Sequence, residues 1–185
     1  MAESRPAPGN LETIRAFVNT LDIEDGTDDL ATPGQLAEWL SAHGLMGKRD
    51  AARPRDLATA IDLREALRGM LRANNGEPAD PADAGVLDEA ASGARFSLTF
   101  DAGGRAKLEP AAKGAAGALG RIVSIVADAM ADGSWARMKA CSNDGCEWAF
   151  YDYARNHSRR WCEMAVCGNR MKARAYRTRH SGTLA

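Results

Sequence analysis

The sequence predicts an α+β fold, in which a mainly helical N-terminal domain with one small antiparallel β-hairpin precedes a small C-terminal domain built around cysteines. Apolar residues recur at helical spacing through most of residues 1–134. The period changes to strand-like alternation only near residues 94–108. All four cysteines lie after residue 140. We therefore expect two domains, residues 1–134 and residues 135–185.

Five segments of the N-terminal part place apolar residues on one helical face. We expect helices over about residues 11–21, 33–43, 54–73, 81–92 and 119–130. The second start is the clearest, because Thr32 can cap it, Pro33 suits the first turn and Gln35 can reach back. Residues 1–9 are expected to form a loose tail, and an acidic loop follows the first helix at residues 22–29.

The hairpin is predicted from alternation. Phe96, Leu98 and Phe100 alternate with polar residues, as in a half-buried strand, a turn follows at residues 101–104, and a partner strand continues to Pro110. Phe17 and Trp39 are expected in the core. Asn19 and Thr20 are interpreted as a hydrogen-bonding pair at a helix end, with a polar pocket as the alternative.

The composition is typical of a globular chain. Of 185 residues, 45% are apolar and 26% charged, so the chain can bury a core without disulfide bonds. It has no run of about 20 apolar residues, and its first residues lack an apolar leader. We therefore expect neither a membrane span nor export, but a cytoplasmic location.

The cysteines form two pairs with equal internal spacing: Cys141 with Cys146, and Cys162 with Cys167. This layout is typical of a four-thiolate zinc site, in which each pair presents two sulfurs to one tetrahedral ion at about 2.3 Å. Disulfides are disfavoured in a reducing compartment, and unrelated buried cysteines would not share one spacing. Ferredoxin cluster spacings do not fit. We expect one structural zinc ion, with Gly145 and Gly168 supplying unusual backbone angles.

Four protein ligands close such a site to substrate, whereas catalytic zinc keeps an open position. The chain also has no phosphate-binding loop, zinc-protease motif or nucleophile elbow. We therefore expect no enzymatic activity. Alternating aromatic residues predict a β-hairpin between the cysteine pairs, and a helix is expected whose first turn carries Cys167. This order of Cys turn, hairpin and helix is that of a treble-clef-like finger, which depends on its metal.

The segment from Cys141 to Arg179 resembles the CGNR zinc finger, whose defining tetrapeptide stands at residues 167–170. The surrounding pattern is also present at Phe150-Tyr151-Asp152, Arg155-Asn156, Arg159-Arg160-Trp161-Cys162, Met164 and Lys172. Upstream, Phe17-Val18-Asn19-Thr20, Leu36-x-x-Trp39-Leu40 and Leu63-Arg64 resemble the ABATE domain of stress-induced transcription regulators. The resemblance implies zinc bound by the four cysteines and nucleic-acid binding.

The charge distribution fits that implication. Residues 1–134 carry 14 basic and 21 acidic residues, a balance of −7, whereas residues 135–185 carry 10 basic and 4 acidic residues, a balance of +6. The zinc tetrathiolate contributes −2, which leaves this part near +4. The candidate nucleic-acid contacts are Arg155, Arg159, Arg160, Arg170, Lys172, Arg174, Arg177 and Arg179.

Alternatives to DNA binding remain open. The arginines could be a solvated face or pair with the acidic half of the chain. The protein could instead be a ligand-sensing or protein-interaction module with purely structural zinc, with a small-molecule effector in its N-terminal domain. Thiolate oxidation with zinc release is a further alternative to an inert site. A homodimer would be needed to read a palindromic DNA site.

Overall fold

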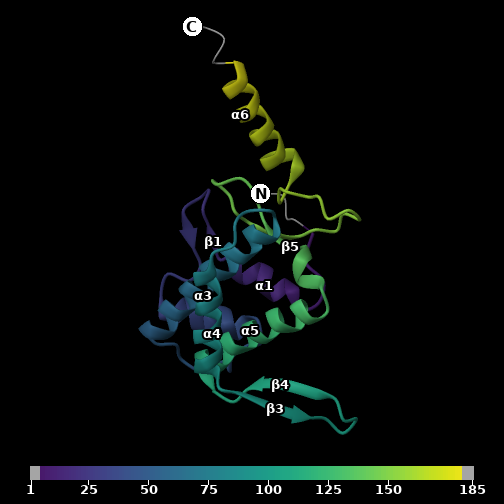
Figure 1. Ribbon diagram of the computed structural model, residues 1–185. Coiled ribbons are helices and arrows are strands. Elements are labelled where there is room, and N and C mark those ends of the chain that lie inside the picture. Colours follow the sequence, from purple (N-terminus) through teal and green to yellow (C-terminus); the bar gives the residue numbers. More distant parts are fainter. Residues whose placement is uncertain (1–4, 181–185) are drawn as a thin grey trace.

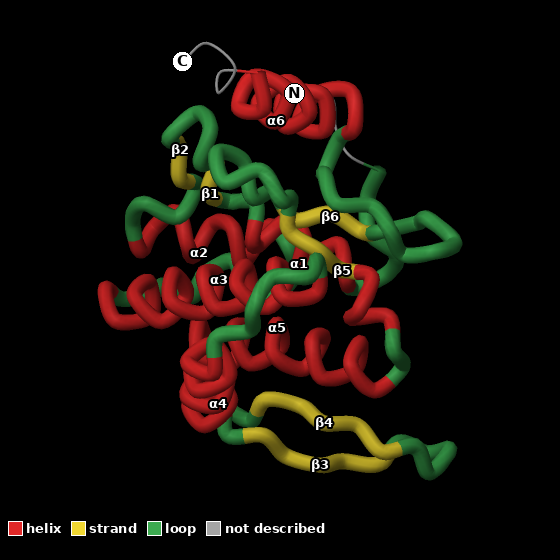
Figure 2. Tube along the Cα trace, turned by 45° about the horizontal axis from the view of Figure 1, so that its top comes forward, coloured by secondary structure: helices red, strands yellow, loops and turns green. Residues whose placement is uncertain are grey.

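The helices of the N-terminal part pack their apolar faces against one another around a shared core (Figures 1 and 2). The computed structural model describes residues 5–180. The helices of this part are α1 (Leu11–Val18), α2 (Pro33–Ala42), α3 (Pro54–Asn74), α4 (Pro81–Ala94) and α5 (Gly114–Ala131). Their core side chains include Ile14, Phe17, Leu36, Leu63, Leu67 and Ile122, all fully buried.

The helix starts follow the expected chemistry. The Thr32 hydroxyl accepts a hydrogen bond from the backbone N–H of Gln35 at the start of α2. At the start of α3, the Asp56 carboxylate accepts from the backbone N–H of Arg53 (2.8 Å).

By length and composition α5 could cross a membrane. In the structure it is the central core helix, which contacts α1, α4 and the strand β4.

Residues 5–180 also form three two-stranded antiparallel sheets. The pairs are β1 (Leu21–Asp22) with β2 (Thr27–Asp28), β3 (Phe96–Phe100) with β4 (Ala106–Pro110), and β5 (Met138–Ala140) with β6 (Ala149–Tyr151). The β3–β4 hairpin lies beside α5 and projects from the helical part. Its strand β4 is nearer to α5 than β3 is (Figures 1 and 2).

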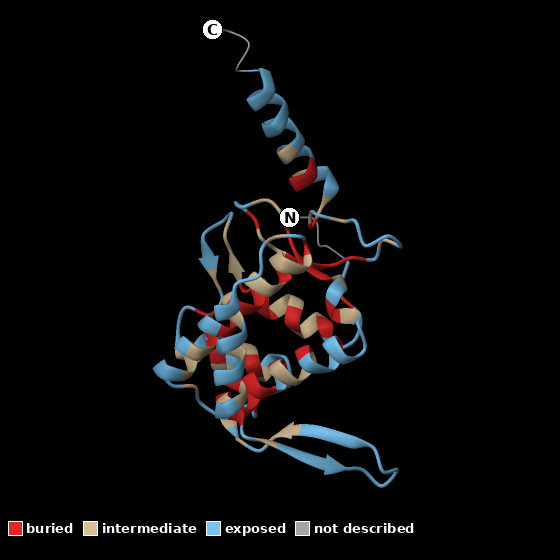
Figure 3. Cartoon of the chain, viewed as in Figure 1, coloured by how far each residue is buried: buried red, intermediate tan, exposed pale blue. Residues whose placement is uncertain are grey.

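The C-terminal part begins inside the main core and ends outside it. A 3₁₀ turn (Ser134–Arg137) leads into β5, and buried Trp135, Met138 and Ala149 belong to the same core as the N-terminal helices. A π-helical turn (Met164–Gly168) then leads into α6 (Asn169–His180). In Figure 3, α6 and the β3–β4 hairpin are exposed projections at opposite ends of the molecule.

The structure confirms the five expected helices and the hairpin, with differences at their ends. The expected half-burial of the first hairpin strand is wrong, because Leu98 and Phe100 are exposed. The fourth helix runs to Ala94 and stops where Arg95 adopts a left-handed conformation (φ 50°), two residues beyond its expected end. The fifth helix starts earlier, at Gly114.

The expectation of a loose tail is wrong for residues 5–9. Tyr153 donates to the carbonyl of Pro6 (2.7 Å), and the guanidinium of Arg5 stacks on the same ring. Residues 1–4 of that expected tail lie outside the described residues.

Candidate metal centre and basic surface

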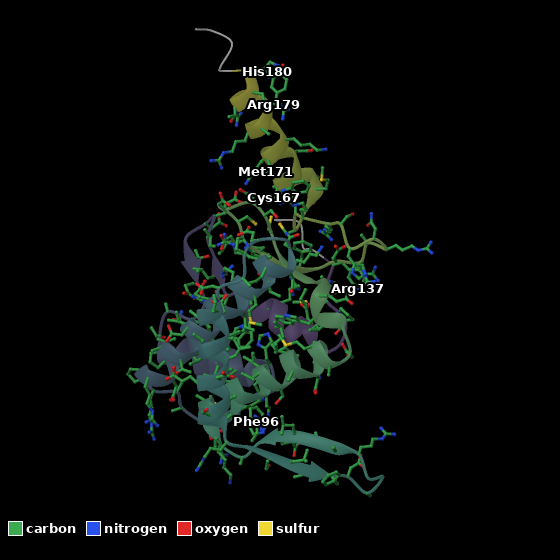
Figure 4. All side chains as sticks on the ribbon, in the orientation of Figure 1. Phe96, Arg137, Cys167, Met171, Arg179 and His180 are labelled. Atoms are coloured by element: carbon green, nitrogen blue, oxygen red, sulfur yellow. The ribbon has the colours of Figure 1, made fainter. Side chains whose placement is uncertain are left out.

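The four cysteines converge on one point at the base of α6, where Figure 4 labels Cys167. All four are buried, and their sulfurs lie within 4.8 Å of one another. The Sγ atom of Cys162 lies 3.6 Å from that of Cys146 and 3.7 Å from that of Cys167. A disulfide needs about 2.05 Å between sulfurs, so the cysteines are free thiols here.

The sulfur spacing fits zinc. A tetrahedral ion with four sulfurs at about 2.3 Å holds them about 3.8 Å apart. The ionisation of the cluster also favours a cation. Hydrogen bonds from the thiols of Cys146 and Cys162 lower the pKa of Cys141 to about 2. The hydrogen bond to Cys141 raises the pKa of Cys146 to about 12, and the pKa of Cys162 is raised as well. A bound divalent ion would offset the repulsion between neighbouring thiolates, and so would favour the ionised form of Cys146 and Cys162.

The local backbone builds the first pair into the loop between β5 and β6. The Cys141 N–H donates to the carbonyl of Trp148 (3.0 Å), and the Cys146 N–H donates to that of Asn143 (2.8 Å). The amide of Asn143 also reaches the Cys167 sulfur at 3.6 Å. Cys167 lies in the π-helical turn directly before α6. The β5–β6 hairpin therefore encloses the first cysteine pair, whereas the sequence predicted a hairpin between the two pairs.

The expected role of two glycines is wrong. Neither Gly145 nor Gly168 has a positive φ. Left-handed positions near the site are instead Glu147 (φ 49°) and His157 (φ 50°). A Cβ at Gly168 would lie 2.5 Å from the sulfur of the exposed Met164 side chain, so a larger residue there would displace that side chain.

Amides and one guanidinium of the N-terminal helices hold the finger in place. The side chain of Asn19 pairs with the backbone of Ala149, donating to its O (3.0 Å) and accepting from its N–H (2.7 Å). Arg68 donates to the carbonyls of Val18 (2.9 Å) and Glu147 (3.0 Å). Asn75 donates to the carbonyl of Ala140 (2.7 Å) and also contacts the Arg160 carbonyl. These residues give the finger a fixed orientation on α1 and α3.

A buried ion pair shapes the turn of residues 153–160, the basic turn. Lys139 Nζ lies 2.8 Å from Asp152 Oδ2, and both side chains are nearly inaccessible. Lys139 also donates to the His157 carbonyl, while Asp152 accepts from the N–H groups of Ala154 and Arg159. Burial raises the pKa of Asp152, but its hydrogen bonds and the Lys139 charge outweigh burial and lower it. The pair thus fixes the turn from inside.

Seven of the eight candidate nucleic-acid residues are exposed. These are Arg155, Arg160, Arg170, Lys172, Arg174, Arg177 and Arg179. Arg159 differs, because its guanidinium donates to the Trp161 carbonyl (2.8 Å) and the Cys162 carbonyl and lies over the Phe150 ring. Its side chain therefore supports the metal site from outside. Figure 4 places Arg179 and His180 at the free end of α6.

One acidic residue of the N-terminal domain reaches this surface. Glu24 Oε1, in the β1–β2 loop, lies 2.6 Å from Arg170 Nη1. The hydrogen bond and charge of Glu24 raise the pKa of Arg170. A groove of about 420 Å³ lies here, and besides Glu24 it is lined by Asn143, Gly145, Arg170, Met171, Ala173, Arg174 and Arg177.

Sequence reasoning missed most of the residues that hold these parts together. Asn19 was expected to serve a helix end, but that role belongs to Thr20, whose hydroxyl donates to the Phe17 carbonyl (2.8 Å). Arg68 and Asn75 look like ordinary helix-surface residues in the sequence. Their carbonyl partners lie between 50 and 85 positions away in the sequence, so no local pattern identifies them.

The fold and the cysteine cluster define a zinc-finger protein with a helical N-terminal domain. Two family models match the chain. Residues 13–133 match ABATE, described as a "Putative stress-induced transcription regulator", and residues 137–180 match the CGNR zinc finger. The chain therefore belongs to the ABATE family and carries a C-terminal CGNR zinc finger with a site for one zinc ion. Comparison with curated proteins gives no match.

Proposed function

We propose that the protein is a DNA-binding transcription regulator in which α6 and the basic turn contact the nucleic acid. The observation that carries the proposal is the exposure of α6. It has 12 residues, none of them buried, and five are Arg or Lys. No acidic residue occurs between residues 164 and 180. Within the described residues, α6 therefore adds no buried side chain to either core.

The dimensions of α6 suit the major groove. Twelve residues span about 18 Å at 1.5 Å per residue. Recognition helices of similar size enter the major groove, where arginine can donate two hydrogen bonds to guanine. An isolated helix of this length is marginal in water. Binding along a polyanion would stabilise it, because its cations would then face phosphates rather than one another.

The zinc ion has a structural part in this proposal. It would be held by Cys141, Cys146, Cys162 and Cys167, and it would link the β5–β6 loop to the turn that starts α6. Bound zinc supplies a fixed crosslink and no open coordination position. The direction in which α6 leaves the body therefore depends on the intact site.

The test is a titration of random and genomic DNA duplexes with the full zinc-loaded chain at several salt concentrations. A Lys172→Ala/Arg174→Ala variant is expected to bind all sequences more weakly and to lower the slope of log K against log salt by about 2. The matched control is Arg49→Ala/Arg55→Ala, which removes the same charge from exposed positions of the N-terminal domain. Equal binding by both variants and the unchanged chain would contradict the proposal.

A cleft favours an additional ligand-sensing role for the N-terminal domain. It has a volume of about 510 Å³ and lies between α1, α5 and β4. Its lining includes Thr13, His43, Glu109, Ser124 and Asp128, and volumes of this size accept small molecules. A thermal-shift screen with metabolites tests this second function. A shift with a metabolite and none with duplex DNA would favour sensing without DNA binding.

We further propose that the protein acts in the cytoplasm and without enzymatic activity. The closed four-thiolate site and the lack of a nucleophile, base and oxyanion arrangement in the sequence support the second point.

A further inference from the structure

The β3–β4 hairpin has one apolar face that the described part of the chain leaves largely uncovered. Its register pairs Phe96 with Pro110, Leu98 with Leu108, and Phe100 with Ala106, so all six side chains share one face. Phe100 is 67% exposed, Leu98 60% and Leu108 48%. A two-stranded hairpin is marginally stable on its own in water. Three or more strands with an apolar face are needed for independent stability, so further strands would stabilise this hairpin.

The outer edge of β3 is open for strand pairing. Ala111 N–H donates to the Arg95 carbonyl, and Asp101 N–H donates to the Arg105 carbonyl, both at 3.0 Å. Hydrogen-bonding residues alternate along an antiparallel pair. The N–H and C=O groups of Phe96, Leu98 and Phe100 therefore point away from β4, toward solvent. Natural edge strands are protected by charges or proline, and β3 has neither between residues 96 and 100.

We propose that the chain forms a two-fold symmetric homodimer through antiparallel pairing of β3 with β3 of a second copy. Leu98 lies opposite its own copy on the symmetry axis. In this register Phe96 faces Phe100, and Ser97 faces Thr99 of the other copy. Aromatic pairs and hydroxyl pairs across strands are both stabilising. The outward groups of the three apolar residues supply six backbone hydrogen bonds across the interface.

Charge complementarity selects this register. Just beyond the paired strands, the left-handed Arg95 of each copy lies near Asp101 of the other, whose carboxylate also accepts from the N–H groups of Gly103 and Arg105, and both residues are exposed. The symmetry produces this opposite-charge pair twice. A shift of the register by two residues would lose both charge pairs and both Phe96–Phe100 contacts. The edge is thus self-complementary in hydrogen bonds, side-chain pairs and charge.

The arrangement closes at two copies. The other edge of the hairpin is β4, which lies beside α5 and ends in Pro110, a residue without an N–H. At this end the packing is tight, because a Cβ on Gly120 would lie 3.0 Å from the Pro110 side chain. Proline and α5 obstruct a further strand at this end of β4, and the proposed product is a dimer with a four-stranded sheet at its centre.

The test is sedimentation equilibrium of the full zinc-loaded chain over a range of concentrations. We expect a species of twice the 19.8 kDa chain mass. Leu98→Pro removes one outward N–H without removing a bond to β4, and it is expected to yield a monomer with unchanged zinc content. A monomer at every concentration in the unchanged chain would overturn the proposal, as would a dimer in Leu98→Pro.

A second variant keeps the test sharp if proline disturbs the hairpin. Arg95→Asp suits the left-handed backbone at this position and sets two acidic residues against each other across the interface. It is expected to weaken the dimer, and to do so less at high salt. Arg105→Asp makes the same charge change within the hairpin, outside the pairing register, and is expected to have little effect. Equal effects of both variants would contradict the proposed register.

Amide hydrogen exchange locates the interface. The N–H groups of Phe96, Leu98 and Phe100 should gain protection as the protein concentration rises. Those of Ser97 and Thr99 already bond within the hairpin and should change less. Concentration-independent exchange at the three outward amides would overturn the proposal. None of these measurements involves DNA, so they are independent of the proposed function.

Discussion

Arg64 connects three parts of the N-terminal domain from a buried position. Its guanidinium makes two hydrogen bonds to Asp28, at 2.7 and 3.0 Å, and a third to the Thr20 hydroxyl. Only 3% of its side chain is accessible. Such forked pairs are the strong class of charged hydrogen bond. Arg64 therefore fixes the β1–β2 hairpin, and with it the acidic loop, on α3.

We predict that Asp28→Asn lowers the free energy of unfolding by about 2–3 kcal/mol at pH 7, because it leaves a buried guanidinium without its main counter-charge. Burial raises the pKa of Asp28, but hydrogen bonds from Arg64 and Leu30 and the Arg64 charge outweigh it, so the pKa is lowered. The contribution is therefore complete above about pH 4 and is lost as pH falls through the lowered pKa.

Urea unfolding at pH 7 and at successively lower pH checks this prediction. The neighbouring Asp29→Asn, at an exposed position, serves as the control. The difference between Asp28→Asn and the unchanged chain should shrink in acid. A difference that grows below pH 4, or an equal loss in the control, would contradict it.

At the scale of elements, the contact between the β1–β2 loop and α6 opposes the proposed function. Glu24 forms an ion pair with Arg170, a side chain that would contact phosphate in the proposed DNA complex. We predict that Glu24→Gln tightens binding to duplex DNA severalfold, because DNA then no longer competes with this carboxylate. Anisotropy titrations at low salt measure the effect, which should fade as salt rises.

Asp25→Asn is the matched control for that prediction. It removes the same charge from the same loop but leaves the Glu24–Arg170 contact in place. If both variants tighten binding equally, the effect is one of overall charge and not of this contact.

The elements show what local sequence patterns determine. Thr32, Pro33 and Gln35 define the start of α2 because capping depends on residues within one turn. The two equal cysteine spacings predicted one metal site for a similar reason, since each pair must present two sulfurs from one turn. The alternation of Phe96, Leu98 and Phe100 likewise predicted β3.

Other features depend on contacts across long sequence separations. The hairpin around Cys141 and Cys146 pairs with the side chain of Asn19, 130 residues away from Ala149. The buried position of Lys139 depends on Asp152, the only carboxylate that the structure brings to it among the described residues. Periodicity carries no information on such pairings, so the sequence could not predict how the finger sits on α1 and α3.

At the scale of the whole molecule, the finger and the helical part share one core, so zinc should stabilise both. We predict that chelation, or Cys162→Ser, lowers the Tm of the entire chain in a single transition, because β5 and β6 pack in the main core. Calorimetry and metal analysis on the same preparation check this, with one zinc per chain expected before chelation.

Ser142→Ala is the control, since Ser142 lies beside a ligand but contacts Asn75 instead. It should retain its metal. Two separate transitions, with only the smaller one sensitive to chelator, would show that the helical part is stable without the finger.

The position of the β3–β4 hairpin, opposite α6 in Figure 1, has a geometric consequence. A two-fold axis through Leu98 would place the two bodies on either side of the joined sheet, with their α6 helices directed apart. Such helices could not enter adjacent grooves of one short palindrome, whose half-sites are about 34 Å apart. Under the proposed DNA binding by α6 and the proposed pairing through β3, each copy would instead bind its own duplex. One dimer would then hold two distant stretches of DNA together.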